Sequence, residues 1–203
     1  MNTCLLDFVL VRGSLRRLAQ LLALCAVLVA PLAACSNTKT IQWREQVKLH
    51  NGQVIVVDRA QVYHKVWGDF QSGWFLDKAS IRATFPTAPP TTVAWEGPLE
   101  PLAIDMTRDG AIYLVSIALN LQASKKYSPG DGFHVAFKYL GNNRWQRIPR
   151  ESVPKSIKVN LLVSVDLAQK YSGHTIGLPL KEKFDSDPRI GPMFRGWDKN
   201  FYF

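Results

Sequence analysis

Two turn dipeptides between alternating stretches constrain the fold of this 203-residue chain more than any other feature. Asn51-Gly52 and Asp109-Gly110 favour two-residue hairpin turns, because glycine adopts positive φ angles without a steric penalty. Residues on either side alternate between apolar and polar, as in a strand with one buried face. Each dipeptide therefore predicts an antiparallel hairpin with its glycine at positive φ. The predicted strand pairs are 43–50 with 53–63, and 102–107 with 111–120.

A third hairpin is predicted at Gly141-Asn142-Asn143, between residues 132–140 and 144–148. Alternation places Phe137, and the residues two and four positions from it, on a face that points inward. It places His134 on the opposite, exposed face. Two more strands are expected at 74–85 and 91–95, separated by prolines that cannot donate ladder hydrogen bonds. The sequence thus predicts a mostly β fold, an antiparallel β-sandwich or partly closed barrel of about seven strands.

Two later regions are less regular. Residues 155–171 fit a strand by their alternating apolar residues and a helix by a partial apolar face, so both alternatives stay open. From residue 179 the sequence turns to proline, glycine, charged and scattered aromatic residues, which predicts an irregular, extended tail over 179–203.

The N-terminus predicts export. Arg12, Arg16 and Arg17 precede an apolar run over 18–34, the order of a signal peptide. The run ends in Leu32-Ala33-Ala34-Cys35, which resembles the lipobox of bacterial lipoproteins. The resemblance implies that residues 1–34 are removed and that Cys35 carries the lipid. An uncleaved transmembrane anchor is the alternative, because about 18 apolar residues can span a bilayer.

Ser36, which follows the cysteine, is not the aspartate that holds such proteins at the inner membrane, so the resemblance implies the outer membrane. We expect the domain to face the periplasm. The predicted division is a signal peptide over 1–34, a polar tether over 35–42, a β domain over 43–178 and the tail. The stretch from Trp43 to Arg59, with Asn160 to Leu162, also looks like a group of bacterial proteins of unknown function. That likeness covers roughly 43–165 and implies a fold but no activity.

Catalytic and metal-binding motifs are not evident. Cys4, Cys25 and Cys35 all lie in or at the end of the predicted signal peptide, which argues against a disulfide framework, a cysteine-ligated zinc site and a cysteine nucleophile in the mature domain. The S-x-x-K match from Ser152 to Lys155 lacks the companion elements of penicillin-recognising enzymes. The four histidines are widely dispersed. We therefore predict no catalytic residue, metal or cofactor.

Two groups of residues are candidates for binding. One is an aromatic, glycine-rich connection, and the other is a cluster of basic residues. The chain as a whole is basic, with 25 Lys and Arg against 16 Asp and Glu, so anionic lipids, lipopolysaccharide or acidic wall polymers are the expected ligands, and export argues against nucleic acid. The alternatives are a buried strand start and a solvated positive face. The candidates are Trp67, Phe70 and Trp74 in the first group, and Lys138, Arg144, Arg147 and Arg150 in the second.

These features predict a lipid-anchored cell-envelope protein whose domain is a non-catalytic binding or structural module, attached to the membrane through Cys35. Two alternatives stay open. One is a periplasmic hydrolase with a site assembled from distant residues, and the other is an accessory subunit of an envelope or secretion assembly. A histidine within hydrogen-bond reach of a serine or carboxylate in a pocket would favour the hydrolase.

Overall fold

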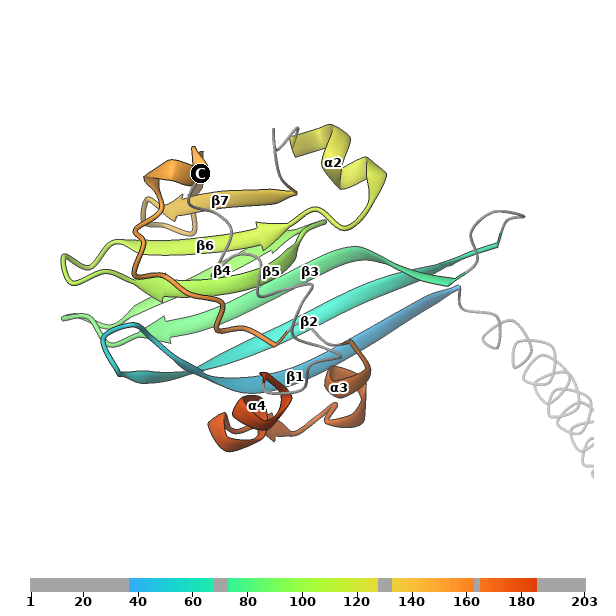
Figure 1. The fold of residues 1–203 in the computed structure, drawn as a ribbon, viewed down its shortest axis with the longest axis horizontal. Coiled ribbons are helices and arrows are strands. Elements are labelled where there is room, and N and C mark those ends of the chain that lie inside the picture. Colours follow the sequence, from blue (N-terminus) through green and yellow to red (C-terminus); the bar gives the residue numbers. More distant parts are fainter. Residues whose placement is uncertain (1–36, 68–72, 128–132, 163–164, 186–203) are drawn as a thin grey trace, which may run out of the picture. The chain divides into compact units, whose positions relative to one another are not determined.

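The computed structural model describes residues 37–67, 73–127, 133–162 and 165–185. Within these ranges nine strands form two sheets, in the orders β4-β3-β2-β1-β9 and β5-β6-β7-β8 (Figure 1). The neighbouring strands run antiparallel except β1 and β9, which are parallel. The strands are β1 (Thr38–Lys48), β2 (Val54–Val66), β3 (Gly73–Phe85), β4 (Thr91–Gly97), β5 (Glu100–Met106), β6 (Ile112–Ile117), β7 (His134–Tyr139), β8 (Trp145–Ile148) and β9 (Thr175–Ile176).

The mostly β class is confirmed, and the two sheets do not close into a barrel. The predicted hairpins are present as β1–β2, β5–β6 and β7–β8. Gly52 and Gly110 have φ values of 87° and 84°, as predicted. In the first turn the Gly52 amide donates to the Leu49 carbonyl oxygen at 2.9 Å, which closes the chain reversal.

The sheets share one core, but only the first sheet shows the expected alternation. Along β1, inward residues such as Ile41 and Val47 are buried and their neighbours are exposed or half-buried. In β5 and β6 every residue is buried. The reason is a second apolar cluster on the outer face of the second sheet, where Val153 and Ile157 of the following segment cover Val115. His134 of β7 is only partly exposed, so its predicted solvated position is wrong.

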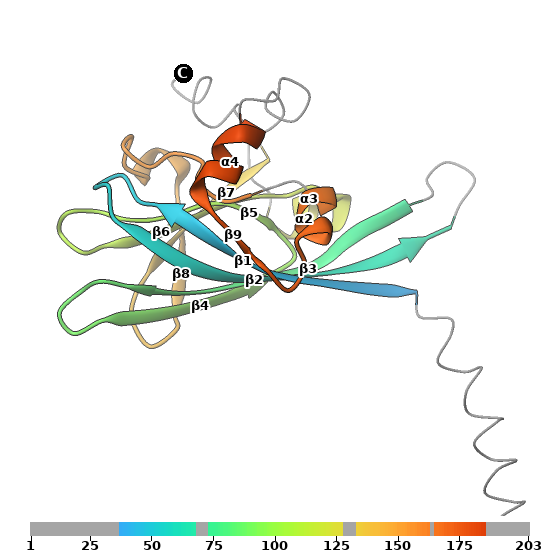
Figure 2. The ribbon, with the colours of Figure 1, turned by 90° about the horizontal axis from the view of Figure 1, so that it is seen from below.

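Within the described ranges, three short helices and a 3-10 turn accompany the sheets. Figure 2, turned from the view of Figure 1, places α3 and α4 beside β1, which they contact. Residues 155–162 have no regular structure, and α3 follows them, so the region with two alternatives is helical only at its end. The elements are α2 (Leu121–Tyr127), η2 (Arg150–Ser152), α3 (Val165–Lys170) and α4 (Leu178–Asp185).

Two predicted boundaries need correction. The polar tether over 35–42 is too long, because β1 begins at Thr38 and pairs with β2 as far as His64, with Ile41 in the core. The predicted extended tail begins too early, because α4 continues to Asp185 and is held by the buried Lys181. The predicted signal peptide, Cys35 and residues 186–203 lie outside the described residues.

Candidate functional site

A groove crosses the outer face of the first sheet. It has a volume of about 770 Å³ and runs over β1, β2, β3 and β4. Its floor is formed by the small side chains of Ala60 and Ser80, which are paired directly, and of Ala94 on β4, which is paired with Arg82. Large side chains at these positions would fill the space. The loop before β9 bounds the groove on the β1 side, where the Gly173 amide donates to the Gln42 carbonyl oxygen at 3.0 Å.

Charged side chains line this groove. Arg44 Nε donates to Asp58 Oδ1 at 2.7 Å, and strand pairing places Asp58 directly opposite Arg82. Glu96, on the neighbouring strand, pairs with Lys78 at 3.3 Å. Among the described residues, Arg82 has no hydrogen-bond or ion-pair partner. The groove therefore offers a guanidinium without an ion pair among the described residues, beside a floor of small side chains, and this arrangement suits a polar ligand with an anionic group.

A second cavity, of about 320 Å³, lies where the β1–β2 turn meets β5 and the segment before α3. Asp105 is almost fully buried there and accepts a hydrogen bond from the His50 backbone amide at 3.0 Å. His50 Nδ1 lies 3.0 Å from Asp105 Oδ1. Because an ionised carboxylate only accepts hydrogen bonds, Nδ1 is the donor in this contact and Nε2 is the ring nitrogen that does not face Asp105. Ser156 and Lys158 line the same cavity.

A buried ionic cluster lies between the sheets. Arg59 bridges two carboxylates, with Nη1 2.8 Å from Glu45 Oε1 and Nη2 3.0 Å from Glu100 Oε1. Lys181 of α4 is also bound to Glu45, and its Nζ donates to the Gln46 carbonyl oxygen at 3.0 Å. The cluster thus joins β1, β2, β5 and α4 through charges that are almost entirely removed from water.

Burial sets the protonation of this cluster. It raises the pKa of Glu100 to about 7, and the Arg59 cation and a hydrogen bond from Gln61 oppose that rise. Burial also raises the pKa of the Tyr63 phenol, whose hydroxyl donates to Gln61 Oε1 at 2.6 Å. On the outer face of the second sheet, burial lowers the pKa of His134 to about 4, with the positive charge of Arg150 acting in the same direction. His134 is therefore neutral at pH 7.

The two predicted aromatic candidates that the structure describes lie together. Trp67 follows β2 and Trp74 belongs to β3, and both are exposed. Lys65 links them, with Nζ 3.8 Å from the ring centroid of Trp67 and 6.0 Å from that of Trp74. The predicted binding residue Phe70 lies outside the described residues. The alternative of a buried strand start is wrong for Trp74, since its side chain is 43% exposed.

The four basic candidates do not share one face. Lys138 of β7 lies opposite Gln146, whereas Arg147 lies opposite Phe137 and so projects from the other face of the β7–β8 pair. Arg144 is exposed in the preceding turn, and Arg150 is half-buried in η2. Strand alternation therefore divides these residues. Binding through the whole basic stretch stays a prediction.

Sequence reasoning missed the two cavities and the ionic cluster. The cluster had a local signal, because Glu45 and Arg59 occupy inward positions in otherwise apolar alternations. The contact between His50 and Asp105 had no such signal, because these residues are far apart in sequence and meet only after the sheets pack.

The described ranges contain no group of three or more His, Cys, Asp or Glu side chains that could hold a metal ion. None of the helices described is long and apolar enough to cross a membrane. Comparisons of the chain with protein-family models, with curated proteins and with solved structures found no match. The predicted likeness over 43–165 to a bacterial family stays a prediction.

Proposed function

We propose that this protein is a lipid-anchored cell-envelope protein, attached through Cys35 to the outer membrane and facing the periplasm, whose β domain is a non-catalytic binding module. The observation that carries the binding function is the groove over β1–β4. Its floor of small side chains lets a ligand approach the sheet closely, and Arg82 supplies a cation without a partner among the described residues. The ligand class that fits is an elongated polar molecule with an anionic group, such as an acidic wall polymer or the phosphate-bearing part of lipopolysaccharide.

Site-specific photo-crosslinking in intact cells tests this proposal. A photoreactive residue in place of Glu96 should capture the ligand, because Glu96 lines the groove. The replacement should leave the fold intact, because the surface ion pair between Glu96 and Lys78 contributes little to stability. The same residue at Arg108, in the exposed β5–β6 turn, is the matched control. Ala60→Trp, which fills the floor, should abolish the adduct at Glu96. Arg82→Glu should weaken it by reversing the charge.

The adduct expected is an anionic envelope polymer or lipid. Equal adducts at Glu96 and Arg108, or an adduct at Glu96 that survives Ala60→Trp, would show that the groove does not bind it. The absence of any adduct at Glu96 would contradict the proposal as well.

Hydrolysis is the second candidate function, and one observation favours it. His50 is oriented by the buried Asp105 in the cavity that Ser156 also lines, which brings together the residue types of a serine hydrolase. Among the described residues, however, Ser156 has no hydrogen bond to His50. A fluorophosphonate probe decides between the functions, because it labels an activated serine covalently. Labelling of the wild-type protein that disappears in both Ser156→Ala and His50→Gln would establish the hydrolase. An unlabelled wild-type protein would show that Ser156, His50 and Asp105 are not a catalytic set.

A further inference from the structure

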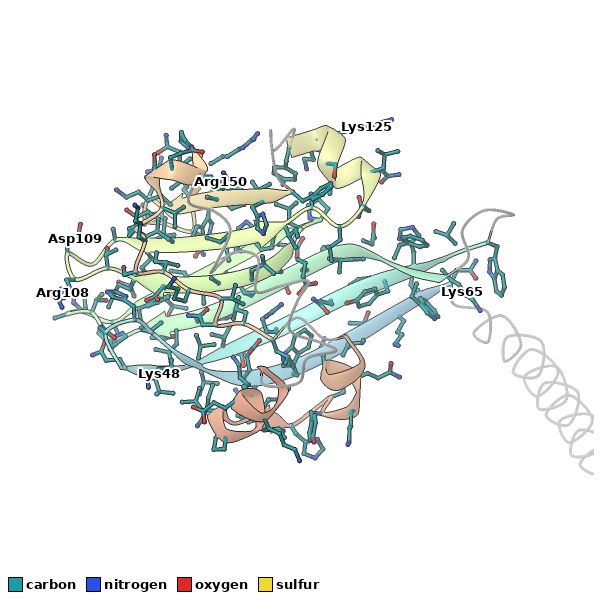
Figure 3. The ribbon with its side chains drawn as sticks, in the orientation of Figure 1. Lys48, Lys65, Arg108, Asp109, Lys125 and Arg150 are labelled. Carbon is teal, nitrogen blue, oxygen red and sulfur yellow. The ribbon has the colours of Figure 1, made fainter. Side chains whose placement is uncertain are left out.

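The end of the first sheet where β1 begins carries an unusual combination of exposed side chains. Trp67 is 69% exposed and Trp74 is 43% exposed. Lys65 lies over both rings, and Lys39 of β1 lies 5.8 Å from the ring centroid of Trp74. We call these four residues the aromatic-cationic tip. Figure 3 shows Lys65 at this end of the sheets and Lys48 at the opposite end.

The charge of the tip is mostly positive. Among the described residues Lys65 forms no ion pair, whereas Lys39 donates a hydrogen bond to the amide oxygen of Gln169. Asp77 of β3 is an acid whose carboxylate lies 4.0 Å from the imidazole of His64. Tryptophan rings prefer the boundary between water and lipid, and lysines beside them extend their charged ends towards phosphate groups. The tip therefore has the chemistry of a bilayer surface contact.

The path of the chain brings this tip close to the proposed anchor. Thr38, the first residue of β1, pairs with His64, so Lys65 and Trp74 lie one position beyond the start of β1. Cys35 precedes Thr38 by three residues, which can span at most about 10 Å. A lipid on Cys35 would therefore hold the membrane surface within reach of the tip, at the end of the sheet opposite Lys48.

We propose that the aromatic-cationic tip contacts the phospholipid surface to which Cys35 is attached, with Trp67 and Trp74 at the level of the headgroups and Lys65 on their phosphates. This inference rests on the proposed lipid anchor for its biological setting, but its chemistry is independent of the anchor. The contact fixes the tilt of the domain, so that the strands of the first sheet run away from the membrane. Anchoring alone would leave the domain free to rotate about a short tether.

The test uses a chain that begins at Ser36 and carries no lipid, so that binding reports on the tip alone. The residues from Thr38 on form a compact unit with a core of their own. Partition of this protein is measured on vesicles of phosphatidylethanolamine and phosphatidylglycerol. The double variant Trp67→Ser and Trp74→Ser should bind at least about tenfold more weakly, because two amphipathic rings are lost. Lys65→Gln should bind about fivefold more weakly to these vesicles and equally to uncharged phosphatidylcholine vesicles.

Matched controls lie elsewhere on the domain. Lys48→Gln removes an exposed lysine at the opposite end, and Leu121→Ser removes an exposed apolar side chain in α2, so both should bind like the parent protein. Vesicles with brominated acyl chains should also quench the tryptophan fluorescence of the parent protein. The double tryptophan variant should not show this quenching. Equal partition of parent and double variant, absent quenching, or equal weakening by Lys48→Gln would overturn the inference.

The two proposals fail separately. If the exported full chain carries no lipid on Cys35, the lipid anchor is refuted while the vesicle measurements still decide whether the tip binds a bilayer. If the chain is lipidated but the tip variants bind vesicles like the parent, the anchor stands and the tip proposal is refuted.

Discussion

Replacement of Arg59 by Met tests the role of the buried ionic cluster. The variant removes the cation that Glu45 and Glu100 share and keeps a long apolar side chain between the sheets. Glu45 retains contacts with Lys181 and with the Leu162 amide, which donates to Oε2 at 2.8 Å. Among the described residues, the one side-chain hydrogen bond that Glu100 then retains comes from Gln61. The Glu100 carboxylate is therefore the group that is destabilised most by the loss of the Arg59 cation.

Removal of one partner from a buried ion pair costs about 3–5 kcal/mol, because the remaining charge stays buried without compensation. We expect Arg59→Met to lower the free energy of unfolding by about 3 kcal/mol at pH 8. The loss should be smaller at pH 6, because Glu100, with a pKa of about 7, then holds a proton and has no charge to compensate.

The assay is urea unfolding followed by circular dichroism at both pH values. Arg44→Met is the matched control, because Arg44 pairs with Asp58 on the exposed face of the same two strands, with side chains 64% and 52% exposed. A surface pair of this kind contributes at most about 1 kcal/mol. Equal losses in Arg59→Met and Arg44→Met would refute the reasoning. If Arg59→Met does not fold, the Lys variants replace the Met variants, and Arg59→Lys should lose more free energy of unfolding than Arg44→Lys.

Three further predictions concern stability. Because the folded-state pKa of Glu100 lies above the ordinary 4.5, the stability that its protonation contributes is complete below about pH 4.5 and is lost as the pH rises through about 7. In urea unfolding, the free energy of unfolding of Glu100→Gln should therefore rise relative to that of wild type by about 3 kcal/mol between pH 4.5 and pH 7 and above. A difference between the two proteins that does not change with pH would contradict the raised pKa of Glu100. Gly52→Val and Gly110→Val should each cost about 1 kcal/mol in thermal melts, through positive φ alone, because a Cβ meets no atom within 4 Å at either position. Lys181→Met should cost about 3 kcal/mol in urea unfolding, whereas the exposed Lys183→Met should change little, and equal effects would mean that the α4 contact with the cluster is unimportant.

The hairpins could be predicted from sequence because their signals are local. Asn51-Gly52 and Asp109-Gly110 specify their turns through two residues each, and alternation extends the strands from there. The register of β1 with β2 follows from that turn, and its continuation to Thr38 was hidden by the polar residues on the outer face.

The remainder depends on packing between distant segments. The outer face of the second sheet is buried because Val153 and Ile157 pack in one cluster with Val115 of β6. No local sequence pattern specifies that the chain returns over this face. Helix α4 has a weak apolar pattern and depends on Lys181, whose partner Glu45 lies at the other end of the chain. The contact between His50 and Asp105 likewise required the tertiary fold.

The mass of the intact protein purified from its own envelope tests the central claim, lipid attachment at Cys35, most directly. The account predicts a chain that begins at Cys35 and carries the added mass of acyl chains, and it predicts that Cys35→Ala leaves the protein without lipid. An unmodified chain that retains residues 1–34, or a lipid-free chain in the membrane fraction, would contradict it.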